Sequence, residues 1–264
     1  PLRVEHGALS HNIGHFVILC AQFEEKILPA SVVRKEVDDK VKKIELEEDR
    51  KVYSKEKKTM REETTMTLLP KAFSKFSDVY AYIDTKNNLL MLNTIQADKT
   101  KTFLSLFKKT FSTDPKSLSL KKISYIMTQW VNTSQWPTGL DIMQQATLQD
   151  PNNVKRVLRC QQQNLFSDAM QSFIKDGHQI KELAMSWQDS FEFVLTDKLL
   201  LKSLRYSDDM LNESQEEIEG AEQRFDSNFI IMAELLSQAL PILMLALVEN
   251  TVEVEAESKE EALA

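Results

Sequence analysis

The sequence predicts an α+β fold, with antiparallel sheets, a protruding two-helix arm and a long C-terminal helix. Five glycines and seven prolines serve 264 residues, and this scarcity favours helices joined by short turns over a many-stranded sandwich. Charge-dense segments with apolar residues at helical spacing alternate with short apolar runs of strand length. A long apolar stretch, Phe229 to Val248, predicts the final helix.

The first part of the chain is expected to be a loop, a strand and a helical arm. Residues 1–15 are predicted to be loop, and the apolar run Phe16–Ala21 has the length of a buried strand. Ser31 and Ser54 are predicted N-caps of two helices, and Pro70 ends the second. Aliphatic residues recur every three or four positions on one face of the first helix, and this stripe loses phase around Tyr53 and then continues to Pro70. These residues are Val33, Val37, Val41 and Ile44, then Met60, Met66 and Leu69.

The stretch that follows the arm mixes cations with aromatic rings. Lys71 and Lys75 alternate with Phe73 and Phe76 over a few residues. Cations and rings together can hold phosphate and apolar surface. The commoner explanation of such a mixture is a pair of lysines that extend over buried aromatic side chains.

The remaining elements are read from apolar periodicity and turn residues. Asn87 and Asn88 lie in the turn of a β-hairpin that runs from Val79 to Thr94. Further helices are expected at about residues 98–110, 123–131, 167–175 and 222–248, and further strands at 154–163, 180–187, 191–195 and 199–206.

The apolar stretch near the C-terminus is long enough to raise the question of a membrane span. Glu234, Ser237, Gln238 and Pro241 interrupt it, so a packed or dimer-forming helix is expected instead. The tail beyond it, which alternates Glu with small residues, is expected to be disordered.

Three parts are expected: a central α+β body, residues 1–30 and 78–207; a helical arm ending in the Lys/Phe stretch, residues 31–77; and a C-terminal helix with an acidic tail, residues 208–264.

The net charge of −7 is unevenly distributed. Residues 208–264 hold 15 acidic residues against Arg224 and Lys259, a balance of −13, so residues 1–207 carry +6. Residues 71–122 alone hold ten lysines and four aspartates. This asymmetry permits a basic binding face, although a solvated lysine-rich surface is the common explanation.

Catalytic and metal-binding patterns are weak in this sequence. Cys20 and Cys160 form no CxxC pair and are expected to be buried, reduced thiols of a cytosolic protein. His11 and His15 flank Gly14 without a third ligand, so no metal or cofactor site is expected. No Gly-rich phosphate loop or catalytic histidine pair is visible, and no enzymatic activity is expected.

The order of several short motifs resembles the RdgC family of bacterial recombination-associated proteins. The shared stretches occur in the family's order over nearly the whole chain. They are Glu24–Pro29, Leu68–Ser77, Ile83–Thr85, Trp130-Val131, Gln163–Leu165, Leu183–Gln188 and Gln223–Ile230.

The resemblance implies a homodimer closed into a ring, with double-stranded DNA passing through a basic central hole and bound without regard to sequence. It also implies a role in limiting the access of the RecA recombinase to DNA, a place in the bacterial cytoplasm at the nucleoid, and no catalysis. The positions that match Lys71 and Phe73 lie in the family at the end of the arm, near a dimer contact and the hole. Lys75 and Phe76 follow as candidate DNA contacts, together with Arg159, Gln162 and Gln163.

Two departures from the family pattern bear on these expectations. Gln162 stands where the family usually has a basic residue, which predicts weaker binding and a lower salt dependence at that contact; Lys155, Arg156 and Arg159 would compensate if they face DNA. The family's initial strand-helix unit is absent, so the sheet edge near Phe16–Ala21 is expected to be unpaired and the chain to be a fragment.

A second function stays open. The arm, residues 31–69, and the helix, residues 222–248, would also suit a structural adaptor that binds a protein partner and no DNA. A metal-dependent nuclease is the third possibility, and it would require a cluster of carboxylates that the linear sequence does not reveal.

Overall fold

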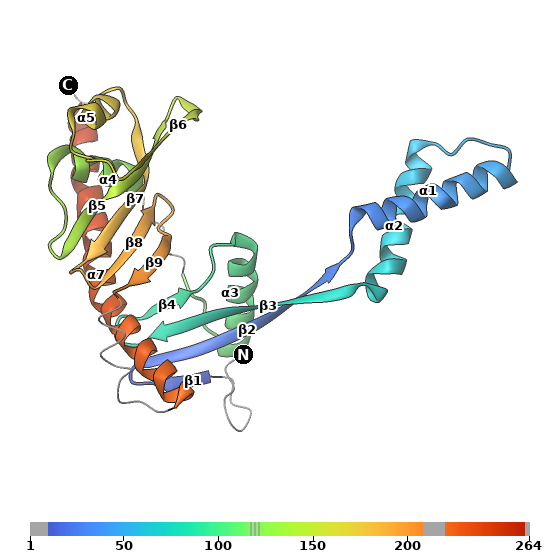
Figure 1. Ribbon diagram of the computed structural model, residues 1–264, viewed down its shortest axis with the longest axis horizontal. Coiled ribbons are helices and arrows are strands. Elements are labelled where there is room, and N and C mark those ends of the chain that lie inside the picture. Colours follow the sequence, from blue (N-terminus) through green and yellow to red (C-terminus); the bar gives the residue numbers. More distant parts are fainter. Residues whose placement is uncertain (1–9, 117, 119, 121, 208–219, 262–264) are drawn as a thin grey trace. The chain divides into compact units, whose positions relative to one another are not determined.

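The computed structural model describes residues 10–116, 118, 120, 122–207 and 220–261. It confirms the α+β fold, with two sheets, a two-helix arm and a long C-terminal helix (Figure 1). The helices are α1 (Ala30–Glu47), α2 (Ser54–Leu68), the short 3-10 helix η2 (Leu69–Lys71), α3 (Ala97–Phe111), α4 (Ile123–Thr133), α5 (Asp168–Lys175) and α7 (Ala221–Glu261). The strands are β1 (Ser10–Ile13), β2 (Phe16–Ile27), β3 (Phe73–Asp84), β4 (Leu89–Leu92), β5 (Leu140–Asp150), β6 (Asn153–Gln161), β7 (Gln179–Trp187), β8 (Phe191–Thr196) and β9 (Leu201–Tyr206).

The chain divides into two compact units, and the division passes through β1, β2, β3, β4 and α3. Unit 1 contains residues 1–11, 18–81 and 92–103, and unit 2 contains residues 12–17, 82–91 and 104–264. Each unit is described below by itself. The three-part division expected from the sequence stays a prediction.

In unit 1, the outer parts of β2 and β3 form a two-stranded ribbon that leads to the helical arm (Figure 1). The predicted valine stripe of α1 is buried against α2, where Val33, Val37, Val41 and Val52 form a small separate core. Neither predicted cap is at the N-cap position: α1 begins at Ala30 after the N-cap Pro29, and Ser54 is the first residue of α2 after the N-cap Tyr53. Because this core is small, polar contacts add to the stability of the arm.

Two of these polar contacts join different segments of the arm. The ammonium group of Lys40 donates to the hydroxyl of Thr64, which is buried, at 2.9 Å. The guanidinium of Arg50 donates two hydrogen bonds of 2.8 Å to the carboxylate of Glu56. This fork holds the pKa of Glu56 below its usual value and fixes the loop between α1 and α2.

Two expectations for the N-terminal part were wrong. Residues 10–13, predicted as loop, form β1, while residues 1–9 lie outside the described part. The strand that begins at Phe16 is not at a sheet edge, because the order β1-β2-β3-β4 places β1 on one side of it and β3 on the other. Apolar residues of a short strand such as Ser10–Ile13 are too few to give an alternating pattern.

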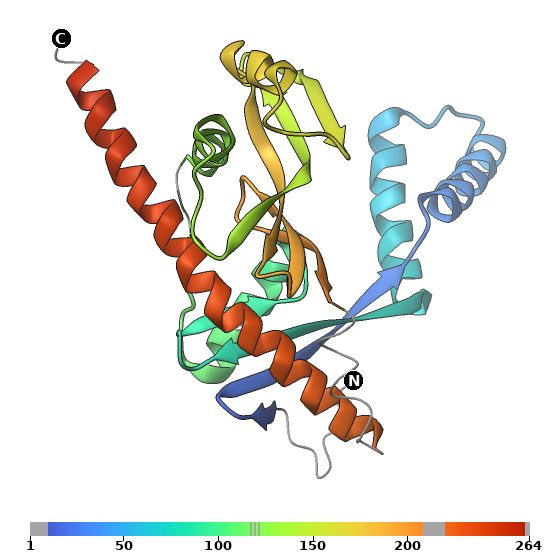
Figure 2. The same cartoon turned by 60° about the vertical axis from the view of Figure 1, so that its left-hand side comes forward.

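Unit 2 is built on an antiparallel five-stranded sheet of order β6-β5-β7-β8-β9. One face of this sheet carries the main hydrophobic core, to which α4 and α7 contribute from the same side (Figure 2). Met127 and Leu183 are completely buried in it. Ser124 and Thr128 on α4 exchange hydrogen bonds with the backbone of Ile180 on β7, so these two buried hydroxyl groups are satisfied.

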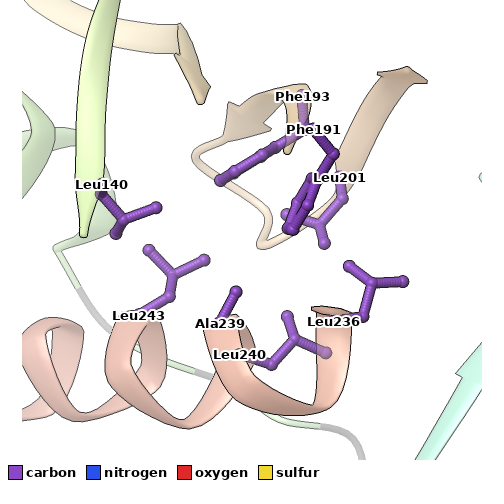
Figure 3. Close-up of a pocket in the computed structure, with 8 residues that line it drawn as sticks. All are labelled: Leu140, Phe191, Phe193, Leu201, Leu236, Ala239, Leu240 and Leu243. Atoms are coloured by element: carbon purple, nitrogen blue, oxygen red, sulfur yellow. The ribbon is translucent and has the colours of Figure 1, made fainter. Parts of the chain in front are cut away.

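The C-terminal helix α7 packs its leucines against the sheet. Leu236, Leu240 and Leu243 point toward Phe191 and Leu140 (Figure 3). By length and composition residues 222–248 could also cross a membrane. The burial of one leucine face in the core of unit 2 instead supports the expectation of a packed helix.

Asp84 ties the hairpin turn to α7. Its carboxylate accepts hydrogen bonds from the backbone N–H groups of Lys86 and Asn87 and from the Asn87 side chain at 2.8 Å. The Asn87 amide also donates to the hydroxyl of Ser237 at 2.7 Å. Burial raises the pKa of Asp84, but the hydrogen bonds from Ser237, Asn87 and Lys86 outweigh it and hold the pKa below its usual value.

Two further differences concern β5 and the tail. Strand β5 was not predicted, because Gln144 and Gln145 interrupt its apolar alternation where its register with β7 shifts. The backbone of α7 continues as helix to Glu261, so the prediction of a disordered tail was wrong for residues 249–261. The acidic connection, residues 208–219, lies outside the described residues.

Candidate nucleic-acid interface

The predicted Lys/Phe stretch lies where the arm joins the ribbon of unit 1. Pro70 ends the regular part of α2 and is followed by Lys71, the last residue of η2. Strand β3 begins two residues later, at Phe73, and continues to Asp84. The four predicted residues Lys71, Phe73, Lys75 and Phe76 are called the arm-end patch below.

The rings of the arm-end patch are not part of a core. Phe73 is 87% exposed and Phe76 is 57% exposed. Lys71 and Lys75 are exposed too, and they form no ion pair with the described residues. The explanation of lysines extended over buried aromatic side chains is therefore wrong for this stretch.

Strand geometry separates the members of the patch. Successive side chains of a strand point to opposite faces, so Phe73 and Lys75 share one face of β3 and Phe76 lies on the other. Lys71 precedes the strand. One face of the ribbon therefore presents a ring beside an ammonium group, a pair that can contact a sugar and a phosphate together.

Cross-strand hydrogen bonds hold β2 and β3 together beneath the patch. The Ser74 hydroxyl donates to Glu24, and the ammonium of Lys26 donates to the Ser74 oxygen at 2.9 Å and to the Ala72 carbonyl at 3.4 Å. Further along the ribbon the Gln22 amide donates to Asp78 at 3.2 Å. These contacts fix the direction in which the residues of the arm-end patch project.

Sequence reasoning missed two lysines of unit 1 that adjoin β3. Lys26 on β2 contacts the backbone between Lys71 and Phe73. Lys99 on α3 donates to the Ser77 hydroxyl at 2.9 Å, and its ammonium lies 5.9 Å from the centre of the Phe23 ring. Both lysines could have been found only from the pairing of β2 with β3, and apolar periodicity in the sequence does not predict this pairing.

A second candidate region is at one edge of the sheet of unit 2. Strand β6 pairs only with β5 in that sheet, and most of its side chains are exposed. Alternation places Lys155 and Arg159 on the face of the sheet that points away from Cys160, which is buried in the core. Arg156 lies on the other face, 3.6 Å from the Asp150 carboxylate. Lys155, Arg159, Gln162 and Gln163 form the sheet-edge patch.

Gln162 and Gln163 follow β6 directly. Gln162 has a left-handed backbone, with φ of 52°, and its side chain is exposed. The N–H of Gln163 donates to the Gln144 carbonyl at 3.3 Å, which fixes the backbone at the end of the strand. Residues other than glycine seldom adopt the left-handed backbone conformation. The turn at Gln162 therefore has a defined backbone geometry, which sets the positions of the two amide side chains.

The two patches consist of basic, amide and aromatic side chains. No group of three or more histidine, cysteine or acidic side chains that could hold a metal ion occurs among the described residues. Both cysteines are free; Cys160 is buried, as predicted, whereas Cys20 is half-buried, and burial raises the pKa of both thiols. The patches offer positive charge, amides and aromatic surface, which suit binding of an anionic polymer.

The comparisons with known proteins agree on one family. A family model described as "Putative exonuclease, RdgC" matches residues 1–250. The recombination-associated protein RdgC of Yersinia pestis (strain Pestoides F) is 34% identical over 256 residues, which cover 96% of this chain and 82% of the relative. The protein of the same name from Yersinia enterocolitica is 35% identical over 257 residues, again 96% of this chain and 82% of the relative.

Proposed function

The chain belongs to the RdgC family, and from this we propose that it binds double-stranded DNA without reading base sequence, as a homodimer closed into a ring. In this proposal the arm-end patch and the sheet-edge patch face the duplex. Their lysines and Arg159 neutralise phosphates and release condensed counterions, which is the sequence-independent part of DNA binding. The glutamines at the end of β6 add hydrogen bonds to the backbone.

One observation carries the proposal furthest. Phe73, at 87% exposure, is a large apolar ring that a free monomer would hold in water between two unpaired lysines. Aromatic residues are enriched among the side chains that contribute most of the binding energy at interfaces. The ring is therefore assigned to a contact with DNA or with the second copy at the end of the arm.

The second dimer contact is assigned to α7. Its side opposite the core exposes Ile242, Leu245 and Val248, of which Leu245 is 57% exposed. The three residues are spaced by three, as neighbours on one helix face are. A second copy of α7 would cover this apolar face.

The cellular role follows from the family. The relatives above are named recombination-associated proteins. A ring that surrounds the duplex would limit the access of the RecA recombinase to DNA, and its place would be at the bacterial nucleoid. In this role the protein breaks no bonds in DNA, although the description of the family model contains the word exonuclease.

Binding to unrelated duplexes tests the proposal. Fluorescent duplexes of equal length and different sequence are titrated with the protein at low salt, once with EDTA and once with Mg²⁺. We expect equal affinities and full-length strands on a denaturing gel. Absence of binding would favour the adaptor function of the arm and α7, and shortened strands in Mg²⁺ would favour a nuclease.

A further inference from the structure

The arm of unit 1 contains a groove that none of the proposed DNA contacts lines. It lies between the first turn of α1, the last turns of α2 and the end of β2, and its volume is about 390 Å³. The groove is therefore large enough for a few side chains of a bound peptide.

The floor and the rim of this groove differ in chemistry. The floor is apolar and is made by Leu28, Val33 and Leu69, of which Leu69 is 42% exposed. The rim is cationic and is made by Lys26, Arg34 and Arg61, with no acidic residue in the lining.

The two arginines have no counterion in the described part of the chain. Neither Arg34 nor Arg61 forms an ion pair there, and both are exposed. By contrast, Lys26 is 3.7 Å from the Glu24 carboxylate and is also bonded to Ser74. Guanidinium groups bind carboxylates through two parallel hydrogen bonds. Arg34 and Arg61, which have no ion-pair partner among the described residues, therefore favour a ligand with carboxylates.

Helix geometry directs these groups into one groove. Arg61, Thr65 and Leu69 follow one another at intervals of four and so share a face of α2 and its continuation. Arg34 is one turn after Ala30 at the start of α1. The groove thus offers two guanidinium groups beside an apolar floor, an arrangement for an acidic peptide with aliphatic side chains. A DNA backbone would leave the apolar floor unused.

The chain itself contains such a peptide. Residues 251–264 lie beyond the part that the family model matches. They carry five acidic residues against Lys259 and also include the aliphatic residues Val252 and Val254. We propose that the arm groove binds this acidic C-terminal segment of a second copy.

This interaction would regulate DNA binding, a consequence that rests on the function proposed above. Lys26 belongs both to the rim of the groove and to the hydrogen bonds that reach Ala72 and Ser74 next to the arm-end patch. An acidic segment bound there would lower the positive potential that attracts phosphates. The segment would therefore act as a competitor of DNA.

The test measures peptide binding directly and does not depend on DNA. The receptor is the full chain with a neutralised tail, in which Glu253, Glu255, Glu257, Glu260 and Glu261 are each changed to Gln. A fluorescent peptide of residues 249–264 is titrated onto it, and anisotropy is recorded at two salt concentrations. We expect saturable binding that weakens with salt.

Two double variants of this receptor locate the site. Arg34→Gln with Arg61→Gln is expected to weaken peptide binding about tenfold. Lys35→Gln with Lys58→Gln removes the same charge from exposed positions of the same helices outside the groove, and this variant should bind like the parent. Equal loss in both variants, or none in either, would overturn the proposal.

A DNA titration of the same variants distinguishes a failure of the groove proposal from a failure of the DNA-binding function proposed above. If Arg34→Gln with Arg61→Gln loses DNA affinity in the neutral-tail chain but peptide never binds, the groove belongs to the DNA surface and the tail proposal is wrong. If peptide binds as expected and DNA does not bind to any variant, the groove proposal stands and the DNA function is wrong.

Discussion

At the scale of single residues, exposure separates the aromatic side chains that are available for binding from those that belong to the core. Phe73 and Phe103 are both preceded or followed by lysines in the sequence, yet Phe73 is 87% exposed and Phe103 is 4% exposed. Local sequence cannot distinguish them, because both stretches mix Phe and Lys. Only the pairing of strands and the packing of α3 separate a surface ring from a core ring.

Replacing Phe73 by Ala should weaken DNA binding without unfolding the protein. An exposed side chain contributes within about 0.5 kcal/mol to stability, whereas loss of an aromatic anchor costs about 2 kcal/mol of binding. The measurements are a thermal melt and a DNA titration of the same preparation. Phe103→Ala serves as the buried counterpart, with an expected loss of about 3–5 kcal/mol in stability. Unchanged DNA affinity of Phe73→Ala would remove this ring from the interface.

Gln162→Lys should strengthen DNA binding. The position is exposed at the end of β6, and a new cation there would neutralise one more phosphate. The log–log salt dependence should then become steeper by about 0.9. Gln162→Glu is the matched control and should weaken binding. Identical salt dependence in all three proteins would place Gln162 away from DNA.

At the scale of elements, the hairpin turn anchors α7 through a buried carboxylate. Asp84→Asn places an amide donor against the Asn87 amide, which is itself a donor, and should cost about 1–3 kcal/mol. Chemical unfolding at neutral pH measures the loss. Asp141→Asn, on the exposed side of β5, should leave stability unchanged. A loss equal in both variants would mean that the contact with α7 is unimportant.

The carboxylate of Asp84 should also make the stability of the fold decrease as the pH falls. The pKa of Asp84 is lower in the folded protein than its usual value of about 3.9. The unfolded chain therefore binds the proton more readily, and the contribution of Asp84 is fully present above about pH 5 and is lost as the pH falls through the folded pKa. Asp84→Asn should flatten the acid limb of a stability profile between about pH 5 and 2. An acid limb that is unchanged in the variant would contradict this assignment.

Elements with a strong local pattern were predictable, and those fixed by distant partners were not. The arm helices follow from the valines of α1, and the hairpin follows from its asparagine turn. Strand β5 was hidden by Gln144 and Gln145, and β1 by its length. The contact of Asn87 with Ser237 joins residues that are 150 positions apart, and no periodicity in the sequence reports such a pair.

The candidate site was predictable as a set of residues but not as a geometry. The Lys/Phe stretch and the end of β6 were visible in the sequence. The sequence did not reveal that Phe76 faces away from Phe73, that Arg156 is paired with Asp150, or that Lys26 and Lys99 adjoin β3. Each of these depends on strand alternation and cross-strand pairing, which require the fold.

At the scale of the whole molecule, the proposed function requires two copies. Leu245→Glu should dissociate the dimer while leaving the fold intact, since the side chain is 57% exposed and charges are depleted in interface cores. Analytical ultracentrifugation over a range of concentrations measures the dissociation. Lys198→Glu, which changes charge in the exposed β8–β9 turn, should remain dimeric. A wild-type protein that is monomeric at all concentrations would exclude the ring.

The salt dependence of DNA affinity tests the central proposal most directly. Wild type, Lys71→Ala and the control Lys198→Ala are titrated with two unrelated duplexes over a series of salt concentrations. We expect the plot of log affinity against log salt concentration to be the same for both duplexes. Its slope should be flatter by about 0.9 in Lys71→Ala alone. A slope that is unchanged in Lys71→Ala, or a marked preference for one duplex, would contradict a ring that grips the phosphates of any sequence.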